Sequence, residues 1–205
     1  MIRDFDELNN RRSEPYKKYF SIMALSKEQI EERINFSKQF EDIMFYILNL
    51  IDVMIENKTV DITFIQSAIV KAYSGILSDY IDLDDYLTDY IEKFATEFPQ
   101  NTIDNQDDPY YLSLDRALYV SENEANSICN YKDMKKALLD GKTEKTWITQ
   151  NDNKVRWTHV EVHEKTIPID ELFVVGNSLM QFPKDISHGA DANEIVNCRC
   201  SIKYS

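Results

Sequence analysis

Glycine and cysteine are scarce in this chain of 205 residues. A single glycine, Gly75, precedes Gly141, and there are four in all. Cysteine occurs three times, an odd number, and Cys198 and Cys200 are separated by one residue, which strains any disulfide between them. We therefore expect reduced thiols rather than a disulfide framework. The sequence also has no Gly-rich phosphate loop, no Gly-x-Ser-x-Gly elbow and no His-Glu-x-x-His helix, which argues against an enzyme.

Long apolar runs are missing as well. The densest run, residues 43–55, is interrupted by Asn49 and Asp52 and is too short to span a bilayer. Residues 1–6 contain no apolar stretch followed by small residues, so no secretory signal is expected. These features predict a protein that folds in a cytoplasm and has no membrane partner.

Negative charge is plentiful and unevenly distributed. The net charge is −13, yet residues 142–205 contain eight Lys/Arg and nine Asp/Glu, so −12 falls within residues 1–141. Such an excess repels phosphate backbones, and direct contact with nucleic acid is therefore not favoured. At 43% hydrophobic and 29% charged residues, the composition is that of an ordinary globular protein.

The sequence changes character near Gly141. Helical periodicities dominate before it, whereas short alternating segments and both tryptophans follow it. This change predicts an α+β fold, with a helical N-terminal region followed by a small α+β C-terminal module that contains a short antiparallel sheet. We place the division at residue 110, with an acidic helical region over 1–110, a possible partner-docking domain, and the module over 111–205.

Local signals mark the ends of the predicted helices. Ser26 and Gln29 form a capping box at the start of a helix that ends at Asn57 and Lys58. Pro99 is expected to end a later helix, and Gly141 to close the last one. The further helices are predicted over 61–80, 84–98 and 112–140, with a loop over 99–109 and a break near Asn130 left open.

Strands are predicted after Gly141. Residues 143–149 and 155–162 are expected to form a hairpin around a turn at 150–153. Residues 195–204 alternate and predict a final strand, in which Cys198 and Cys200 share one face.

An ordered set of residues marks the C-terminal module and the helix before it, over roughly residues 115–204. The set comprises Trp147, Asp152, Arg156, His159, Pro183, Asp185, Asn197, Cys198, Arg199 and Cys200; we call them the signature residues. Their order resembles that of the phage head morphogenesis family, the Mu F-like minor head proteins.

The resemblance implies a virion component rather than an enzyme. It implies a structural protein of the head interior that is associated with the portal protein and other capsid proteins, acts in head assembly or DNA ejection, and requires no cofactor. The chain departs from the family pattern at two places. His163–Lys165 stand where the family usually has an Asp-Gly turn, and Pro183–Asp185 stand where many members have Pro-Gly-Asp. Residues 1–110 resemble no family.

Two interpretations of the cysteines remain open. They are either small buried hydrophobes of the last strand or ligands of a zinc ion. The candidate metal ligands are His159, His163, Cys198 and Cys200, with His188 as a further possibility.

Catalysis by Arg156 and His159 is not expected. Residues three apart in a strand face opposite sides, so the two cannot act on one atom. Arg156 is instead expected to pair with the carboxylate of Asp152 or Asp185. Two alternative functions also remain open: a regulatory or host-interacting protein derived from a head gene, and a zinc-binding or toxin-like enzyme.

Overall fold

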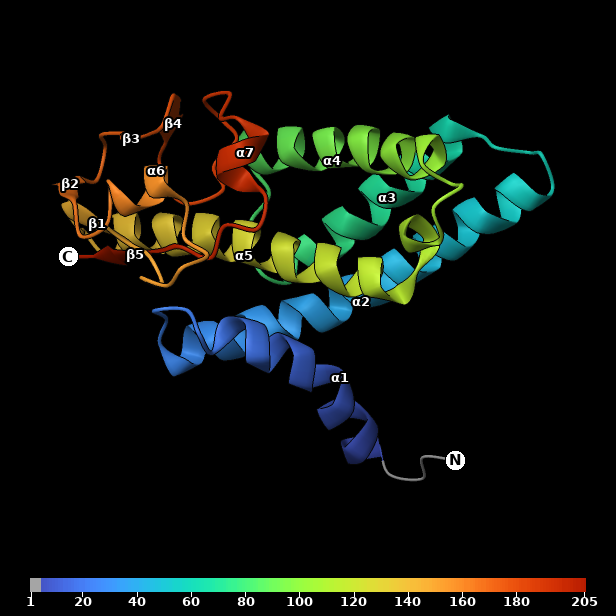
Figure 1. Ribbon diagram of the computed structural model, residues 1–205, viewed down its shortest axis with the longest axis horizontal. Helices are drawn as coiled ribbons and strands as arrows, with labels where there is room; N and C mark the ends of the chain where they lie inside the picture. Colours follow the sequence, from blue (N-terminus) through green and yellow to red (C-terminus); the bar gives the residue numbers. More distant parts are fainter. Residues whose placement is uncertain (1–4) are drawn as a thin grey trace. The chain divides into compact units, whose positions relative to one another are not determined.

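A computed structural model describes residues 5–205, with side chains from Arg12 onward (Figure 1). The fold is α+β, as predicted: it is mostly helical, with short antiparallel sheets near the C-terminus. Two compact units divide the chain. We call residues 36–121 the central unit, and the described residues before and after it the terminal unit. The predicted division at residue 110 coincides with neither boundary, because two long helices, α2 (Lys27–Glu56) and α5 (Leu114–Leu139), each continue from one unit into the other.

Local capping contacts hold three helix starts, and the first of them, the capping box at Ser26 and Gln29, was predicted. In the capping box of α2, the Ser26 amide donates to Gln29 Oε1 (2.9 Å) and the Gln29 amide donates to Ser26 Oγ (3.2 Å). Asp61 caps α3 (Ile62–Leu77) by accepting from the Phe64 amide at 3.0 Å. Asp84 caps α4 (Asp85–Asp104) in the same way, through the Leu87 amide at 3.1 Å.

The predicted end of α4 is wrong. The helix continues through the buried Pro99 to Asp104, and a short 3₁₀-helix, η1 (Pro109–Leu112), follows. A proline inside a helix removes one backbone hydrogen bond at a cost of about 3 kcal/mol. Tertiary contacts offset that cost, because the Arg116 guanidinium donates to Thr102 Oγ1 (2.8 Å) and to Asn101 Oδ1 (3.2 Å) in the segment after Pro99.

Aromatic rings form the core of the central unit. Phe40 is fully buried and its ring centroid lies 4.5 Å from that of Tyr73 and 5.7 Å from that of Phe94. Phe94 in turn stacks on Phe98 at 5.2 Å. Rings from α2, α3 and α4 thus meet in one cluster, as their helical spacing in the sequence requires.

The terminal unit begins with a helix that the sequence signals did not predict. This helix, α1 (Phe5–Phe20), buries Tyr16 and Phe20 and contains Pro15. Later in the chain α5 is continuous, without the break considered near Asn130. Gly141, at φ +69°, closes α5 as expected, and its amide donates to the Leu138 carbonyl at 3.2 Å.

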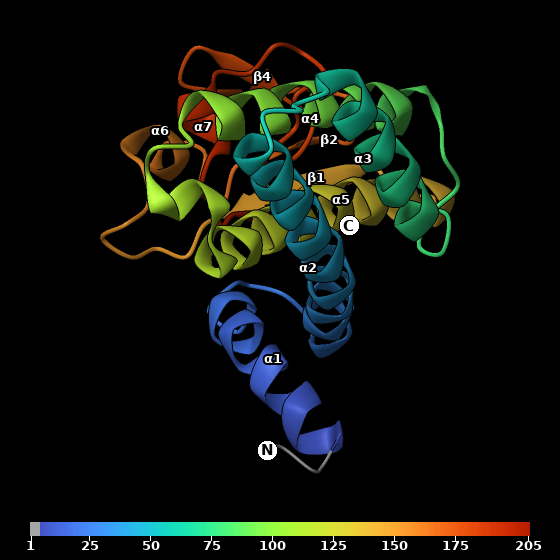
Figure 2. The same ribbon diagram turned by 90° about the vertical axis from the view of Figure 1, so that its right-hand side faces the viewer.

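A three-stranded antiparallel sheet with the order β2-β1-β5 lies in the terminal unit. Its strands are β1 (Glu144–Ile148), β2 (Thr166–Pro168) and β5 (Ser201–Tyr204), and β1 lies alongside the C-terminal half of α5 (Figures 1 and 2). In register, Thr146 is opposite Thr166, and Trp147 is opposite Ile202. A second pair joins β3 (Phe173–Val175) to β4 (Ser178–Met180). Trp147 is fully buried in the core beneath these strands.

The predicted hairpin partner of β1 is wrong. Within 155–162, Trp157–Val160 form the helical turn α6, with Thr158 and His159 buried and Trp157 exposed. Two consecutive buried side chains fit a helical turn rather than an alternating strand. The final strand is also shorter than predicted, because Ala192–Ile195 form the helical turn α7 and Asn197 has φ +57°. Among the helices of residues 5–205, none combines the length and the apolar character needed to cross a membrane.

Candidate functional site

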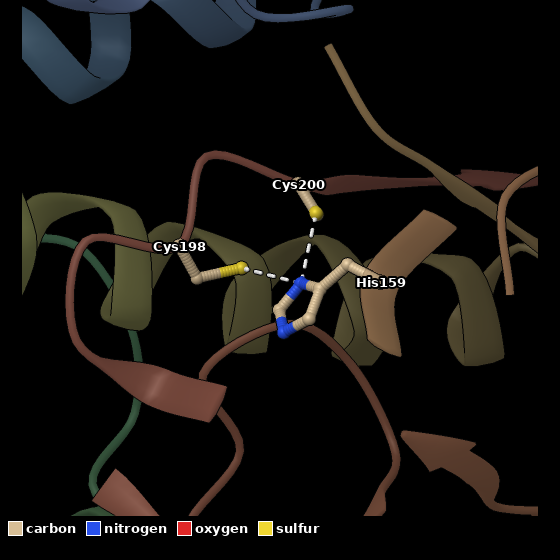
Figure 3. A group of neighbouring side chains, drawn as sticks. All are labelled: His159, Cys198 and Cys200. Carbon is tan, nitrogen blue, oxygen red and sulfur yellow. Dashed lines mark hydrogen bonds between the residues drawn. The ribbon is translucent and has the colours of Figure 1, made fainter. Parts of the chain in front are cut away.

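His159, Cys198 and Cys200 meet in the interior of the terminal unit. His159 belongs to α6, whereas the two cysteines lie in the segment that leads into β5. Both sulfur atoms face the same ring nitrogen, His159 Nδ1, at 3.3 Å for Cys200 and 3.6 Å for Cys198 (Figure 3). The ligand atoms of all three residues lie within 4.8 Å of one another. The exposed fractions are 1% for His159, 1% for Cys198 and 3% for Cys200, so the cluster is closed to solvent.

The other ring nitrogen of His159 is held by a carboxylate. Glu194 Oε2, on α7, lies 2.9 Å from His159 Nε2 and also accepts from Thr158 Oγ1 at 2.8 Å. Trp147 packs its ring edge-on against the imidazole at 5.7 Å. These contacts fix the plane of the ring and keep Nδ1 directed at the two sulfur atoms.

The protonation of the cluster is set by the mutual contacts of its members. Burial lowers the pKa of His159, but the hydrogen bond and charge of Cys198, followed by the charge of Glu194, outweigh it and raise the pKa above its usual value. A hydrogen bond from Cys200 and the interaction with His159 hold the pKa of Cys198 well below its usual range, although burial opposes them. The same hydrogen bond and burial raise the pKa of Cys200, while the indole N–H of Trp147 opposes this rise. Without a metal, these two opposite pKa shifts favour a Cys198 thiolate beside a His159 imidazolium.

Side chains of α5 hold the loops around the cluster. Asn126 Nδ2 donates to the Cys198 carbonyl at 3.1 Å, and Asn130 Nδ2 donates to the Pro183 carbonyl at 3.0 Å. Lys184 Nζ donates to Asn123 Oδ1 at 2.6 Å. Positions 123, 126 and 130 follow the helical period, so one face of α5 supports both C-terminal loops.

The remaining signature residues of these loops also make local contacts. Arg199 binds Asp152 in a bidentate ion pair, at 2.8 and 2.9 Å, which replaces the expected pairing of Asp152 with Arg156. Arg156 donates instead to the Val196 carbonyl. Asp185 is fully buried and accepts from the Gln181 amide at 2.8 Å.

Two histidines considered as ligands lie outside the cluster. His163 Nδ1 accepts from the Thr149 amide at 3.1 Å, and His188 Nδ1 lies 2.8 Å from Ser187 Oγ. The expectation that Arg156 and His159 face opposite sides is wrong, because Arg156 precedes the helical turn that contains His159, and both line one small cavity together with Cys198 and Cys200. Three of the four predicted metal ligands are thus brought together.

Glu194 was not predicted as a site residue, nor was Thr158. Glu194 lies in the run that ends at Cys200, but no spacing rule links it to His159, 35 positions earlier. It also lines a surface cleft of about 770 Å³ together with Trp157 and Val196.

The cluster can hold a thiophilic metal ion or, in the absence of one, a buried thiolate–imidazolium pair. Comparison with known proteins adds no assignment: no family model, no curated protein and no solved structure matches the chain.

Proposed function

We propose that this protein is a minor head protein of a tailed phage or prophage. It binds the portal protein and other capsid proteins in the head interior, and it acts in head assembly or DNA ejection. Residues 111–205 are the rigid Mu F-like module, most of which lies in the terminal unit, and the acidic central unit contacts a basic surface on a partner.

The observation that carries this proposal is the backbone conformation at the two departures from the family pattern. Lys184, which stands where many members have glycine, has φ +71°. Glu164, within the turn where the family usually has Asp-Gly, has φ +58°. Residues other than glycine seldom adopt positive φ. At both departures the chain therefore adopts the backbone conformation that glycine favours. This supports the view that this chain and the family share the same backbone conformation at these turns, although the side chains differ.

The contacts of the signature residues support a structural role. The Arg199–Asp152 ion pair ties the segment before β5 to the turn after β1, and Arg156 ties α6 to Val196. Asp185 organises its own loop by accepting from the Ser187 amide (2.9 Å) and hydroxyl (2.6 Å) as well as from Gln181. Residues that stabilise loops in this way account for the ordered signature without any catalytic step.

The charge of the central unit supports a basic partner. Residues 36–121 contain sixteen Asp/Glu and five Lys/Arg, so they carry −11 of the net −13. Asp82, Asp85 and Asp89 are exposed at the start of α4. Charged surfaces of opposite sign accelerate association and restrict the choice of partner, and salt weakens their attraction.

The proposal is tested by co-expression of the full chain with a portal protein from the genome that encodes it. We expect both proteins to elute together in a fixed ratio by size exclusion and native mass spectrometry. The triple variant Asp82→Asn/Asp85→Asn/Asp89→Asn should weaken this association about tenfold or more at low salt, because three charges are removed from one region.

The control removes the same charge from the terminal unit through Glu164→Gln, Asp170→Asn and Glu171→Gln, all exposed, and should leave binding within about twofold. Absence of the protein from purified virions, together with failure to bind the portal protein, would refute the proposed function. Equal losses for both triple variants would refute docking through the central unit.

A further inference from the structure

The geometry points to a zinc-binding centre in the terminal unit, formed by His159 Nδ1 and the Sγ atoms of Cys198 and Cys200. This site goes beyond the proposed function, since a structural head protein needs no metal. Zinc binding and portal binding are measured in separate experiments, and failure of one does not affect the other.

The spacing of the three donor atoms fits tetrahedral zinc. Bonds of about 2.0–2.1 Å to nitrogen and 2.3 Å to sulfur place the nitrogen and sulfur ligands about 3.5 Å apart. The observed distances from His159 Nδ1 are 3.3 Å to Cys200 and 3.6 Å to Cys198. Both sulfurs approach the same nitrogen from different sides (Figure 3). A metal ion beside these three atoms can therefore reach all of them with little movement.

The surroundings of His159 match those of a metal-bound imidazole. Zinc-ligating histidines almost always donate their second N–H to a carboxylate or carbonyl, which fixes the tautomer and raises ligand basicity. Glu194 Oε2 is in this position, 2.9 Å from His159 Nε2, and Thr158 holds the carboxylate in turn.

Charge balance also favours a divalent ion. Two thiolates, a neutral imidazole and Zn²⁺ form a neutral group, which is the form that burial penalises least. Binding releases two protons to solvent, one from the Cys200 thiol and one from the His159 imidazolium. The buried indole N–H of Trp147 interacts with Cys200, and a metal-bound thiolate there is a stronger acceptor for it than a neutral thiol.

The identity of the metal follows from its donors and from the space beside them. Soft thiolates with an imidazole select zinc over magnesium or calcium, which prefer oxygen. A cavity of about 10 Å³, lined by Asn197 and Val155 as well as by the three donor residues, adjoins the site. This is the space of about one water molecule, so the fourth ligand is a water.

The test measures metal in untagged, full-length protein. We expect about one zinc per chain by elemental analysis after purification under reducing conditions. Replacement of zinc by Co²⁺ should give the absorption bands of a tetrahedral cobalt–thiolate complex. Removal of zinc should lower the thermal midpoint, and stoichiometric zinc should restore it, since a ligand that binds only the folded state stabilises it.

Variants identify the site and separate metal loss from misfolding. Cys200→Ser and His159→Gln should lose the cobalt–thiolate spectrum or shift it, with zinc below about 0.2 per chain. Cys129→Ser, at a buried cysteine of α5 outside the cluster, and His163→Gln should keep full zinc. Glu194→Gln keeps all three ligands and should weaken zinc affinity about 10- to 100-fold while the protein stays folded.

The proposal is overturned if wild-type protein contains less than about 0.2 zinc per chain and added zinc or Co²⁺ changes neither the spectrum nor the thermal midpoint. In that case the cluster is the metal-free thiolate–imidazolium pair. Full zinc in both Cys200→Ser and His159→Gln would also overturn it, because the metal would then be bound elsewhere.

Discussion

The two units bury different kinds of side chain. Among the described side chains, fifteen buried polar residues belong to the terminal unit and four to the central unit, whose other buried side chains are aliphatic groups and aromatic rings. Each unit nevertheless contains a buried arginine, Arg33 in the terminal unit and Arg116 in the central unit. Polar networks impose specific geometry on a core, whereas apolar packing tolerates change of shape more readily. We infer that hydrogen bonds specify the loops of the terminal unit and that ring packing specifies the helices of the central unit.

The largest expected effect comes from Arg33→Met. The fully buried guanidinium donates to Asp133 Oδ2 (2.9 Å), Asn130 Oδ1 (2.9 Å) and Asn126 Oδ1 (3.3 Å). Its removal leaves a carboxylate and two buried amides without their donor. The free energy of unfolding should fall by about 3–5 kcal/mol. Urea titration followed by tryptophan fluorescence measures this loss, because both tryptophans lie in the terminal unit.

A second variant sharpens that test. In Arg33→Met/Asp133→Asn the unpaired charge is gone, and about half of the lost stability should return. A loss below about 1 kcal/mol for Arg33→Met alone would contradict the view that polar contacts specify this unit.

The matched change in the central unit, Arg116→Met, should cost less. Arg116 is bound by neutral acceptors alone, among them the Tyr111 carbonyl at 2.7 Å, and its guanidinium carbon stacks 4.7 Å from the centre of the Phe98 ring. Methionine keeps much of that stacking and leaves no buried charge unpaired. We expect a loss of about 1–3 kcal/mol. The measurement is far-UV circular dichroism in urea, since the central unit has no tryptophan. If Arg116→Met lowered the free energy of unfolding as much as Arg33→Met, buried polar contacts would matter equally in both units, and the distinction between them would be wrong.

These contrasts also explain which features the sequence could predict. The capping box at Ser26 and Gln29 acts within four residues and was confirmed. The helices predicted to start near Asp61 and Asp84 do start there, and each aspartate caps its helix over an equally short distance. The helical continuation through Pro99 could not be predicted, because it depends on Arg116, seventeen positions later.

The candidate site shows the same limit. The sequence predicted His159, Cys198 and Cys200 as metal ligands, but it predicted His163 as well. Only the structure shows that His163 lies outside the cluster. The alternation of 155–162 predicted a strand, whereas burial of both Thr158 and His159 requires a helical turn. Glu194 reaches His159 only because α6 and α7 are brought together by the loops around them.

A smaller effect is expected from Glu122→Gln, and it depends on pH. Burial raises the pKa of Glu122 to about 7, and the charge of Lys184 opposes this rise. Because the folded-state pKa exceeds the ordinary value, this group stabilises the fold below about pH 4.5, and that contribution is lost as the pH rises through about 7. Glutamine stays neutral, so the variant should be more stable than wild type by about 1–2 kcal/mol at pH 8, with allowance for partial exposure.

The check is a series of urea titrations between pH 4.5 and 8, read by tryptophan fluorescence. As the pH rises over this range, the free energy of unfolding of the wild type should decrease relative to that of Glu122→Gln. Glu161→Gln, at an exposed acid of the terminal unit, is the control and should run parallel to wild type. Parallel curves for wild type and Glu122→Gln would show that burial of this carboxyl does not affect stability.

The smallest effects come from one glycine in each unit, and they should have opposite signs. A Cβ added at Gly141 or Gly75 meets no atom within 4 Å, so neither substitution by alanine is limited by space. Gly141 has φ +69°, where alanine is strained, and Gly141→Ala should cost about 1 kcal/mol. Gly75 lies within α3, where Gly75→Ala should add about 0.5–1 kcal/mol. Thermal unfolding followed by circular dichroism and by tryptophan fluorescence assigns each shift to its unit. Stabilisation by both substitutions would mean that the end of α5 is not held in the left-handed conformation, and the loops supported by α5 would then be less rigid than the polar network implies.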